Sequence, residues 1–173
     1  MGEIISIMKK IIIATTMLLF INNIVMAGND TQPSNIGFAL RGGITFAPTD
    51  FYGTNINVYP TIGLSADFGI SKLPFFIETG VYLTNRYIMT DSNISVLAPA
   101  LISYHIQTRK NMTIQPFIGP FIAYGFDYEE ADVGVRMGVG LSINKLYTNC
   151  GYDISASNGY DEDAFFLSIG YKF

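Results

Sequence analysis

After residue 35, apolar and polar side chains alternate along most of the chain, and this period of two is the pattern of β-strands with two different faces. The pattern breaks into eight segments of roughly 10–14 residues: 36–46, 56–68, 75–86, 94–106, 113–126, 132–143, 146–155 and 165–173. Tilted strands of this length can cross the hydrocarbon layer of a membrane. The sequence therefore predicts an all-β fold, an eight-stranded antiparallel up-and-down transmembrane β-barrel over residues 35–173.

The composition is more apolar than that of an ordinary soluble protein, with 49% hydrophobic and 14% charged residues. Beyond residue 27, however, no apolar run approaches the ~18 residues that a membrane helix needs. The apolar residues are instead distributed one at a time along the strands. The sequence gives no indication of a helix, a second domain or a long linker in this region.

Residues 1–27 read as a cleavable signal peptide. Lys9 and Lys10 supply a basic start, residues 11–25 are mostly apolar, and Val25-Met26-Ala27 fits a cleavage site. Cleavage after Ala27 would leave 173 − 27 = 146 residues that begin with a short polar segment, 28–34. A membrane anchor is the alternative, and either Met1 or Met8 can be the start. The single cysteine, Cys150, excludes an internal disulfide, and no cysteine follows the signal region as a lipoprotein anchor would require.

Aromatic side chains on the apolar face fall near the two ends of the strands, with aliphatic residues between them. Such girdles are typical of the headgroup layers on either side of a bilayer. The predicted girdle residues are Phe38, Phe46, Phe68, Phe75, Tyr104, Tyr124, Phe126, Phe165 and Tyr171.

The opposite face mixes glycine with charged residues. An eight-stranded barrel is narrow, so its interior is filled by side chains. We expect the charged set to form an interior network of three arginines and four carboxylates: Arg41, Asp67, Glu78, Arg86, Asp132, Arg136 and Asp153. The alternative is a soluble sandwich or lipocalin-like barrel, in which these charges face water.

The predicted connections also separate by charge. The turns 69–74, 107–111 and 144–145 contain Lys72, Arg109, Lys110 and Lys145, whereas the loops 47–54, 89–93, 127–130 and 157–163 contain eight acidic residues and no basic one. With both ends of the barrel domain on the periplasmic side, this gives a basic inner rim and an acidic outer rim.

The closing FFLSIGYKF, with Gly170, Tyr171 and Phe173, resembles the C-terminal signal by which outer-membrane barrels are recognised for insertion. Together with ISVLAPALISYHI (94–106), IQPFIGPFIAYGF (114–126) and ADVGVRMGVGLSI (131–143), it resembles the Bacteroidetes-type outer-membrane β-barrel domain family, the PorT-like family. The OmpX and OmpA barrels are similar in architecture. The resemblance implies a location and a fold, and it allows an accessory role in a secretion system. The prolines at 60, 99, 116 and 120 suggest bulges or local irregularity in the strands.

Few residues suggest a catalytic, metal-binding or ligand-binding site. Ser103 and His105 could form a nucleophilic pair in a lipid A-modifying enzyme, but they lie next to the inner turn 107–111, away from the outer leaflet. The acidic clusters 127–130 and 161–163 lack the spacing of a calcium loop, so a solvated loop is the default interpretation. An apolar patch on the inward face is either packing or the lining of a hydrophobic-ligand site: Leu97, Pro99, Leu101, Phe117 and Phe121.

The sequence therefore predicts a small, porin-like but non-enzymatic barrel in the outer membrane of a Gram-negative cell envelope. We expect a structural or surface-interaction role and no cofactor, catalytic residue or metal site. Its expected partners are outer-membrane lipid, lipopolysaccharide and the barrel-insertion machinery, with no nucleic acid, and we expect a monomer. A lipid-binding barrel, a secretion accessory and a lipid A-modifying enzyme remain the alternatives.

Overall fold

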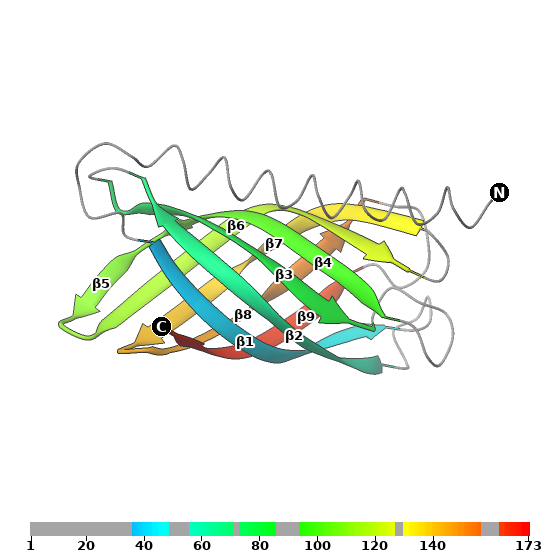
Figure 1. Cartoon of the computed structure of the whole chain (residues 1–173), viewed down its shortest axis with the longest axis horizontal. Coiled ribbons are helices and arrows are strands. Elements are labelled where there is room, and N and C mark those ends of the chain that lie inside the picture. Colours follow the sequence, from blue (N-terminus) through cyan, green and yellow to red (C-terminus); the bar gives the residue numbers. More distant parts are fainter. Residues whose placement is uncertain (1–35, 49–55, 71–72, 86–93, 127–129, 157–162) are drawn as a thin grey trace. The chain divides into compact units, whose positions relative to one another are not determined.

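The computed structural model describes residues 36–48, 56–70, 73–85, 94–126, 130–156 and 163–173. These residues contain nine strands (Figure 1): β1 Ile36–Pro48, β2 Ile56–Gly69, β3 Phe75–Thr84, β4 Ser95–Tyr104, β5 Ile106–Arg109, β6 Met112–Gly125, β7 Glu130–Ile143, β8 Leu146–Ser155 and β9 Ala164–Lys172. The predicted signal peptide, the segment 28–34 and most of the predicted outer loops lie outside the described residues. No described helix has the length and apolarity needed to cross a membrane.

The strands form one antiparallel sheet in the order β4-β3-β2-β1-β9-β8-β7-β6-β5, and a further pairing between β4 and β6 closes it. β5 continues β4 after a break at His105, and both pair with β6. The nine segments are therefore eight barrel strands, and the predicted fold is confirmed. β1 begins and β9 ends at the same end of the barrel, which we call the inner end; the opposite end is the outer end.

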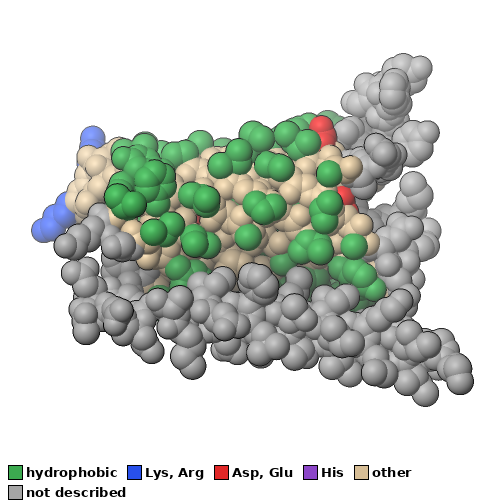
Figure 2. Space-filling model, turned by 90° about the horizontal axis from the view of Figure 1, so that it is seen from above, with side chains coloured by type: hydrophobic (Ala, Val, Ile, Leu, Met, Phe, Trp, Pro, Cys, Tyr) green, Lys and Arg blue, Asp and Glu red, His purple; other side chains and the backbone are tan. Residues whose placement is uncertain are grey.

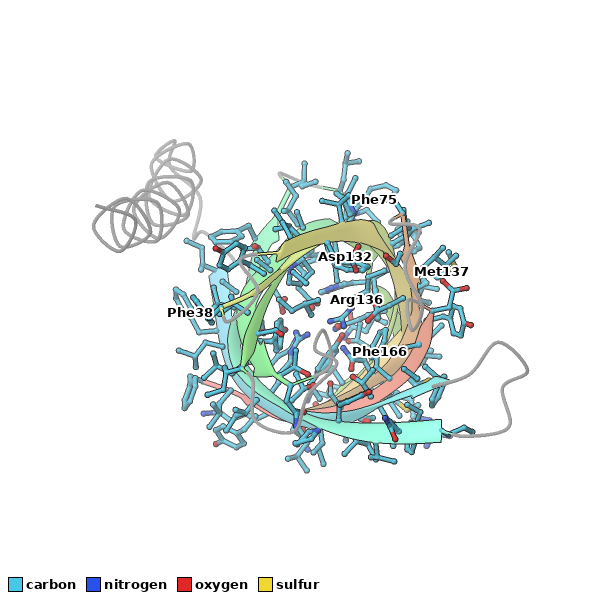
Figure 3. The ribbon with its side chains drawn as sticks, turned by 90° about the vertical axis from the view of Figure 1, so that its right-hand side faces the viewer. Phe38, Phe75, Asp132, Arg136, Met137 and Phe166 are labelled. Carbon is cyan, nitrogen blue, oxygen red and sulfur yellow. The ribbon has the colours of Figure 1, made fainter. Side chains whose placement is uncertain are left out.

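Side chains alternate between lumen and outside along the strands. In Figure 3, Phe38, Phe75 and Met137 point away from the barrel, whereas Asp132, Arg136 and Phe166 point into it. The outward positions of β7 are apolar and mostly exposed, and its inward positions include buried glycines and Arg136. Exposed Val, Ile, Leu and Phe side chains occur on the outward face of the strands, as the sequence pattern predicts, and Figure 2 shows hydrophobic side chains over the visible face.

The prolines cause local irregularity at two positions and no change of register at any. Pairing between β3 and β4 is interrupted at Pro99 and pairing between β4 and β6 at Pro120, whereas the ladders through Pro60 and Pro116 are continuous. Pro60 pairs with Ile44, Pro99 with Phe121 and Pro116 with Val139, and the register is the same on both sides of each. Near Pro99 the structure instead provides a side-chain hydrogen bond, from Thr79 Oγ1 to the Pro99 carbonyl (2.9 Å). The observed register shift lies between Gln107 and Arg109, away from all four prolines.

The narrow lumen of eight strands is partly filled by inward aromatic rings that lie against glycines of the barrel wall. A Cβ atom built on Gly138 would lie 2.7 Å from Phe117 Cζ, and one on Gly134 would lie 2.6 Å from Phe121. A Cβ atom on Gly151 would likewise lie 2.7 Å from Phe166 Cζ. The inward glycines of the sequence thus leave the space that the rings occupy, and the barrel interior is a packed core.

Candidate functional site

The charged side chains inside the barrel are the main candidate site, and they fall into two groups. The first group lies toward the inner end and contains Arg41, Asp67, Glu78 and Lys172. The second group lies nearer the outer end and contains Arg136, Asp153 and Asp132. We call both groups together the interior network.

Arg41 of β1 is the centre of the first group, and only 2% of its surface is exposed. Its Nη1 donates hydrogen bonds to Glu78 Oε1 of β3 and to Tyr82 Oη (3.3 Å). Its Nη2 lies 3.8 Å from Asp67 Oδ1, an ion pair without a direct hydrogen bond. The guanidinium also lies 4.2 Å from the centre of the Tyr147 ring. Two carboxylates and an aromatic face thus compensate the buried cation.

Asp67 and Glu78 are direct cross-strand partners on β2 and β3, so two like charges face the same part of the lumen. Lys172 of β9 relieves this repulsion, because its Nζ lies 2.8 Å from Asp67 Oδ2. The same ammonium lies 4.7 Å from the centre of the Tyr147 ring. The first group therefore contains two cations and two anions and is electrically balanced.

Arg136 and Asp153 form the second group's bidentate ion pair. Arg136 Nε and Nη2 donate to the two oxygens of Asp153 at 2.7 and 2.8 Å, and Asp153 is fully buried. The Phe166 ring covers the guanidinium, with its centre 4.3 Å from Cζ. Nearer the outer end, Ser155 Oγ donates to Asp132 Oδ1 at 2.6 Å. The two hydrogen bonds between Arg136 and Asp153 form a bidentate ion pair, which is among the strongest side-chain pairings.

Small residues beside the network make room for the long side chains. A Cβ atom on Gly170 would lie 2.7 Å from Arg41 Cγ, so this glycine of β9 allows Arg41 to cross the lumen. Gly170 is also part of the predicted insertion signal, and its lack of a side chain has this separate packing role.

Side chains occupy much of the lumen among the residues that the structure describes. One cavity between the two groups, lined by Arg41, Glu78, Tyr82, Arg136 and Phe166 among others, leaves about 20 Å³ for the centres of water molecules. That is room for one or two waters. The inward apolar residues fill space in the same way: Leu97 and Phe121 pack with Tyr82, and Leu101 and Phe117 pack with Phe166.

Six of the seven predicted network residues lie in the described part of the chain, and all six are inward. Arg86 lies outside the described residues. The sequence interpretation left Lys172, Tyr82 and Tyr147 out of the network, although all three have the inward parity. Their inward parity could have placed them in the network. Their contacts with the cations could not be predicted, because alternation does not give distances across the lumen.

The predicted girdle residues all have the outward parity, but the exposed fraction of their side chains differs. Phe38, Phe75, Tyr104 and Tyr171 near the inner end are well exposed, and the Phe75 and Tyr104 rings are 5.0 Å apart. Phe126 and Phe165 near the outer end are also exposed, whereas Phe46 and Tyr124 are half-buried. Phe68 differs from the others, because it has the outward parity but only 8% of its surface is exposed.

Ser103 and His105 lie at the inner end of the lumen. Ser103 Oγ is 3.2 Å from His105 Nε2, and the imidazole stacks on Phe76 at 3.7 Å between ring centres. Ser103 is 1% exposed. A nucleophile needs access to its substrate, and this hydroxyl is enclosed. The described residues contain no cluster of histidine, cysteine and carboxylate groups that could hold a metal ion.

Searches found no family model and no curated protein that matches the chain. The resemblance to the PorT-like family therefore has no support. Solved structures do match. The crystal structure of Ail, the attachment invasion locus protein of Yersinia pestis, has a TM-score of 0.53 at 10% identity over 82% of this chain and 100% of Ail. The crystal structure of Neisserial surface protein A has a TM-score of 0.51 at 12% identity, again over 82% of this chain and all of the other. A further Ail crystal structure contains the heparin analogue sucrose octasulfate.

These likenesses establish a fold shared with small outer-membrane barrels of the OmpX-like architecture. The outward face supplies an independent argument, because a continuous belt of exposed Val, Ile, Leu and Phe is unfavourable in water and suited to lipid. Closing the sheet also pairs its strands all the way round, as a membrane requires. The chain is a transmembrane β-barrel of the outer-membrane type.

Proposed function

We propose that the protein is a non-enzymatic outer-membrane barrel that acts through its surfaces, in a structural or surface-interaction role, and does not transport solutes through its lumen. The observation that carries this proposal is the occupied interior. Arg41 and Arg136 extend into the lumen and bind acidic residues there, and the cavity between them has room for one or two waters. A lumen closed in this way leaves the two rims and the lipid-facing belt as the working surfaces.

The structural neighbours support the surface-interaction part of the proposal. One is named an attachment invasion locus protein and another a surface protein. We do not carry over the heparin analogue found with Ail, because the four outer connections contain eight acidic residues and no basic one in the sequence, and Asp163 among them is exposed. A rim of this charge would repel a polysulfated ligand. We expect instead lipopolysaccharide held through divalent cations, or a basic protein surface.

The alternatives have less support. A hydrophobic ligand needs a pocket of several hundred Å³, roughly 300–1,000 Å³, and the interior cavity is far smaller. A lipid A-modifying enzyme would need accessible chemistry in the outer leaflet, whereas Ser103 and His105 lie at the inner end. An accessory role in secretion was suggested by the PorT-like resemblance, and no feature of the described barrel favours it.

The test has two steps. Outer-membrane fractions from cells that express the full chain should contain a protein whose gel mobility changes on boiling, as expected of a folded barrel. Lipid A from the same cells should have the same mass spectrum with and without expression. A new lipid A species that disappears with His105→Ala would replace our proposal with the enzyme hypothesis.

A further inference from the structure

A basic patch lies on one side of the inner end, where two tight turns are joined. The turn between β5 and β6 contains Lys110 and Asn111, and the turn between β7 and β8 contains Asn144 and Lys145. The backbone N–H of Asn144 donates to the Asn111 carbonyl at 2.9 Å, which fixes the turns side by side. We call Arg109, Lys110 and Lys145 the inner basic patch.

The patch has a defined shape. Asn144 adopts a positive φ of 55°, a conformation that asparagine tolerates well, and this makes the two-residue turn possible. Thr108 Oγ1 donates to the Met112 carbonyl at 3.1 Å and braces the other turn. The backbone N–H of Lys172 donates to the Lys145 carbonyl at 2.7 Å, so β9 is joined to the same structure.

The three cations of the patch are exposed, and none has an ion-pair partner among the residues that the structure describes. The carboxylates in the inner half of the described lumen, Asp67 and Glu78, are occupied by Lys172 and Arg41. Figure 2 shows basic side chains at one end of the visible face and acidic side chains at the other. The inner basic patch is therefore positive charge available to an external anion.

The position of the patch identifies the anion. Lys145 lies between Ile143 and Leu146, whose exposed side chains belong to the lipid-facing belt. Its Nζ lies 5.6 Å from the centre of the outward Tyr171 ring. Aromatic rings of a membrane protein mark the headgroup layer, and flexible cations beside them reach lipid phosphates. We propose that the inner basic patch binds the phosphate headgroups of anionic phospholipids; with the inner end on the periplasmic side, as the sequence predicts, these belong to the inner leaflet.

The test measures lipid selectivity around the inserted barrel. The full barrel is reconstituted into vesicles of phosphatidylcholine, and the relative association of spin-labelled phosphatidylglycerol and phosphatidylcholine is read by electron paramagnetic resonance. We expect a preference of about threefold for the anionic lipid, lost at molar salt because it is electrostatic. The variant R109Q/K110Q/K145Q should have no preference, whereas K110R/K145R, which keeps the charges, should behave as the wild type does.

A boiled-versus-unboiled gel confirms that each variant is folded before its lipid selectivity is compared. The proposal is wrong if the folded triple glutamine variant retains the wild-type preference, or if the wild type has none. It is also wrong if inorganic phosphate abolishes the preference when chloride of equal ionic strength does not, because the patch would then be a site for free phosphate. If the patch instead binds a periplasmic protein, the wild type and both variants should show the same lipid ratio, and this result would also overturn the proposal.

Discussion

At the residue scale, the buried charges are tolerated because each is matched by an opposite charge within the lumen. Asp67 and Glu78 are neighbours on adjacent strands, and Lys172 and Arg41 compensate them. Removing a charge from water costs several kcal/mol per ion, so such a group is stable only while its partners are present. The interior network should therefore be sensitive to loss of one partner and much less sensitive to loss of a whole pair.

Arg136→Ala tests this expectation. The substitution removes both hydrogen bonds that the guanidinium donates to the fully buried Asp153, and we expect the free energy of unfolding to fall by about 3–5 kcal/mol. Urea titration of the reconstituted barrel, followed by gel mobility, measures the loss. The double variant R136M/D153L removes the charges together and should recover much of it. A double variant as unstable as R136A would contradict a mainly electrostatic explanation.

Gly138→Ala tests the packing of rings against glycine. The new Cβ would lie 2.3 Å from the Cys150 carbonyl oxygen and 2.7 Å from Phe117 Cζ, so backbone or ring must move. We expect a loss of about 1–3 kcal/mol in unfolding free energy, as for other overpacked cores. Gly42→Ala is the matched control, because its Cβ would lie 4.0 Å from the nearest neighbour, the Thr61 carbonyl oxygen. Equal unfolding free energies of the two variants would show that the strands and the Phe117 ring adjust to the new methyl group without destabilising the barrel.

The sequence predicts some of these pairings and cannot predict others. The two-residue turn at Asn144–Lys145 fixes the register of β7 and β8, so the opposition of Arg136 and Asp153 follows from counting back along both strands. Arg41 and Glu78 lie on strands that are not neighbours, and their contact depends on the curvature of the closed sheet. Alternation identifies inward residues, but it does not say which of them meet across a lumen.

At the element scale, the period of two located all eight barrel strands, and the ends of most agree within a few residues. The observed end of β3 at Thr84 is earlier than the predicted Arg86, which lies outside the described residues. The segment 94–106 contains a break at His105 that its pattern did not indicate, since both of its faces are partly apolar. The prolines indicated local irregularity, and strand pairing is interrupted at Pro99 and Pro120 without a shift in register.

The lipid-facing surface of β7 provides a test at this scale. Val139 and Ile143 are both outward and exposed, but Ile143 lies at the inner end of the strand next to the turn. Arginine on the lipid face costs about 2–4 kcal/mol near the bilayer midplane and about 0–1 kcal/mol near its surface. We expect Val139→Arg to destabilise the folded barrel much more than Ile143→Arg in lipid, as measured by urea titration in vesicles. Similar small effects of both substitutions would indicate that β7 faces water.

At the scale of the whole molecule, closure of the sheet encloses the inward side chains of all eight strands in one lumen. Eight strands give a lumen narrow enough for side chains to fill, and the inward sequence contains residues of the right size and charge to fill it. The number of strands could be predicted from the sequence, whereas the volume left inside could not, because it depends on how Arg41, Arg136 and Phe166 share the same space. The filling of the lumen by side chains was therefore predictable from the sequence, but the size of the remaining cavity follows only from the three-dimensional arrangement.

Ion conductance measures that closure directly. The wild-type barrel in a planar bilayer should produce no steady current steps of porin size, because the interior network and Phe166 occupy the cross-section. The double variant R41A/F166A removes two side chains that line the 20 Å³ cavity, and we expect it to conduct where the wild type does not. Val139→Ala, an outward change of similar kind, should leave the baseline unaltered. If the wild type already conducts as well as the double variant, ions cross a path that these side chains do not block, and the proposal that the protein works only through its surfaces fails.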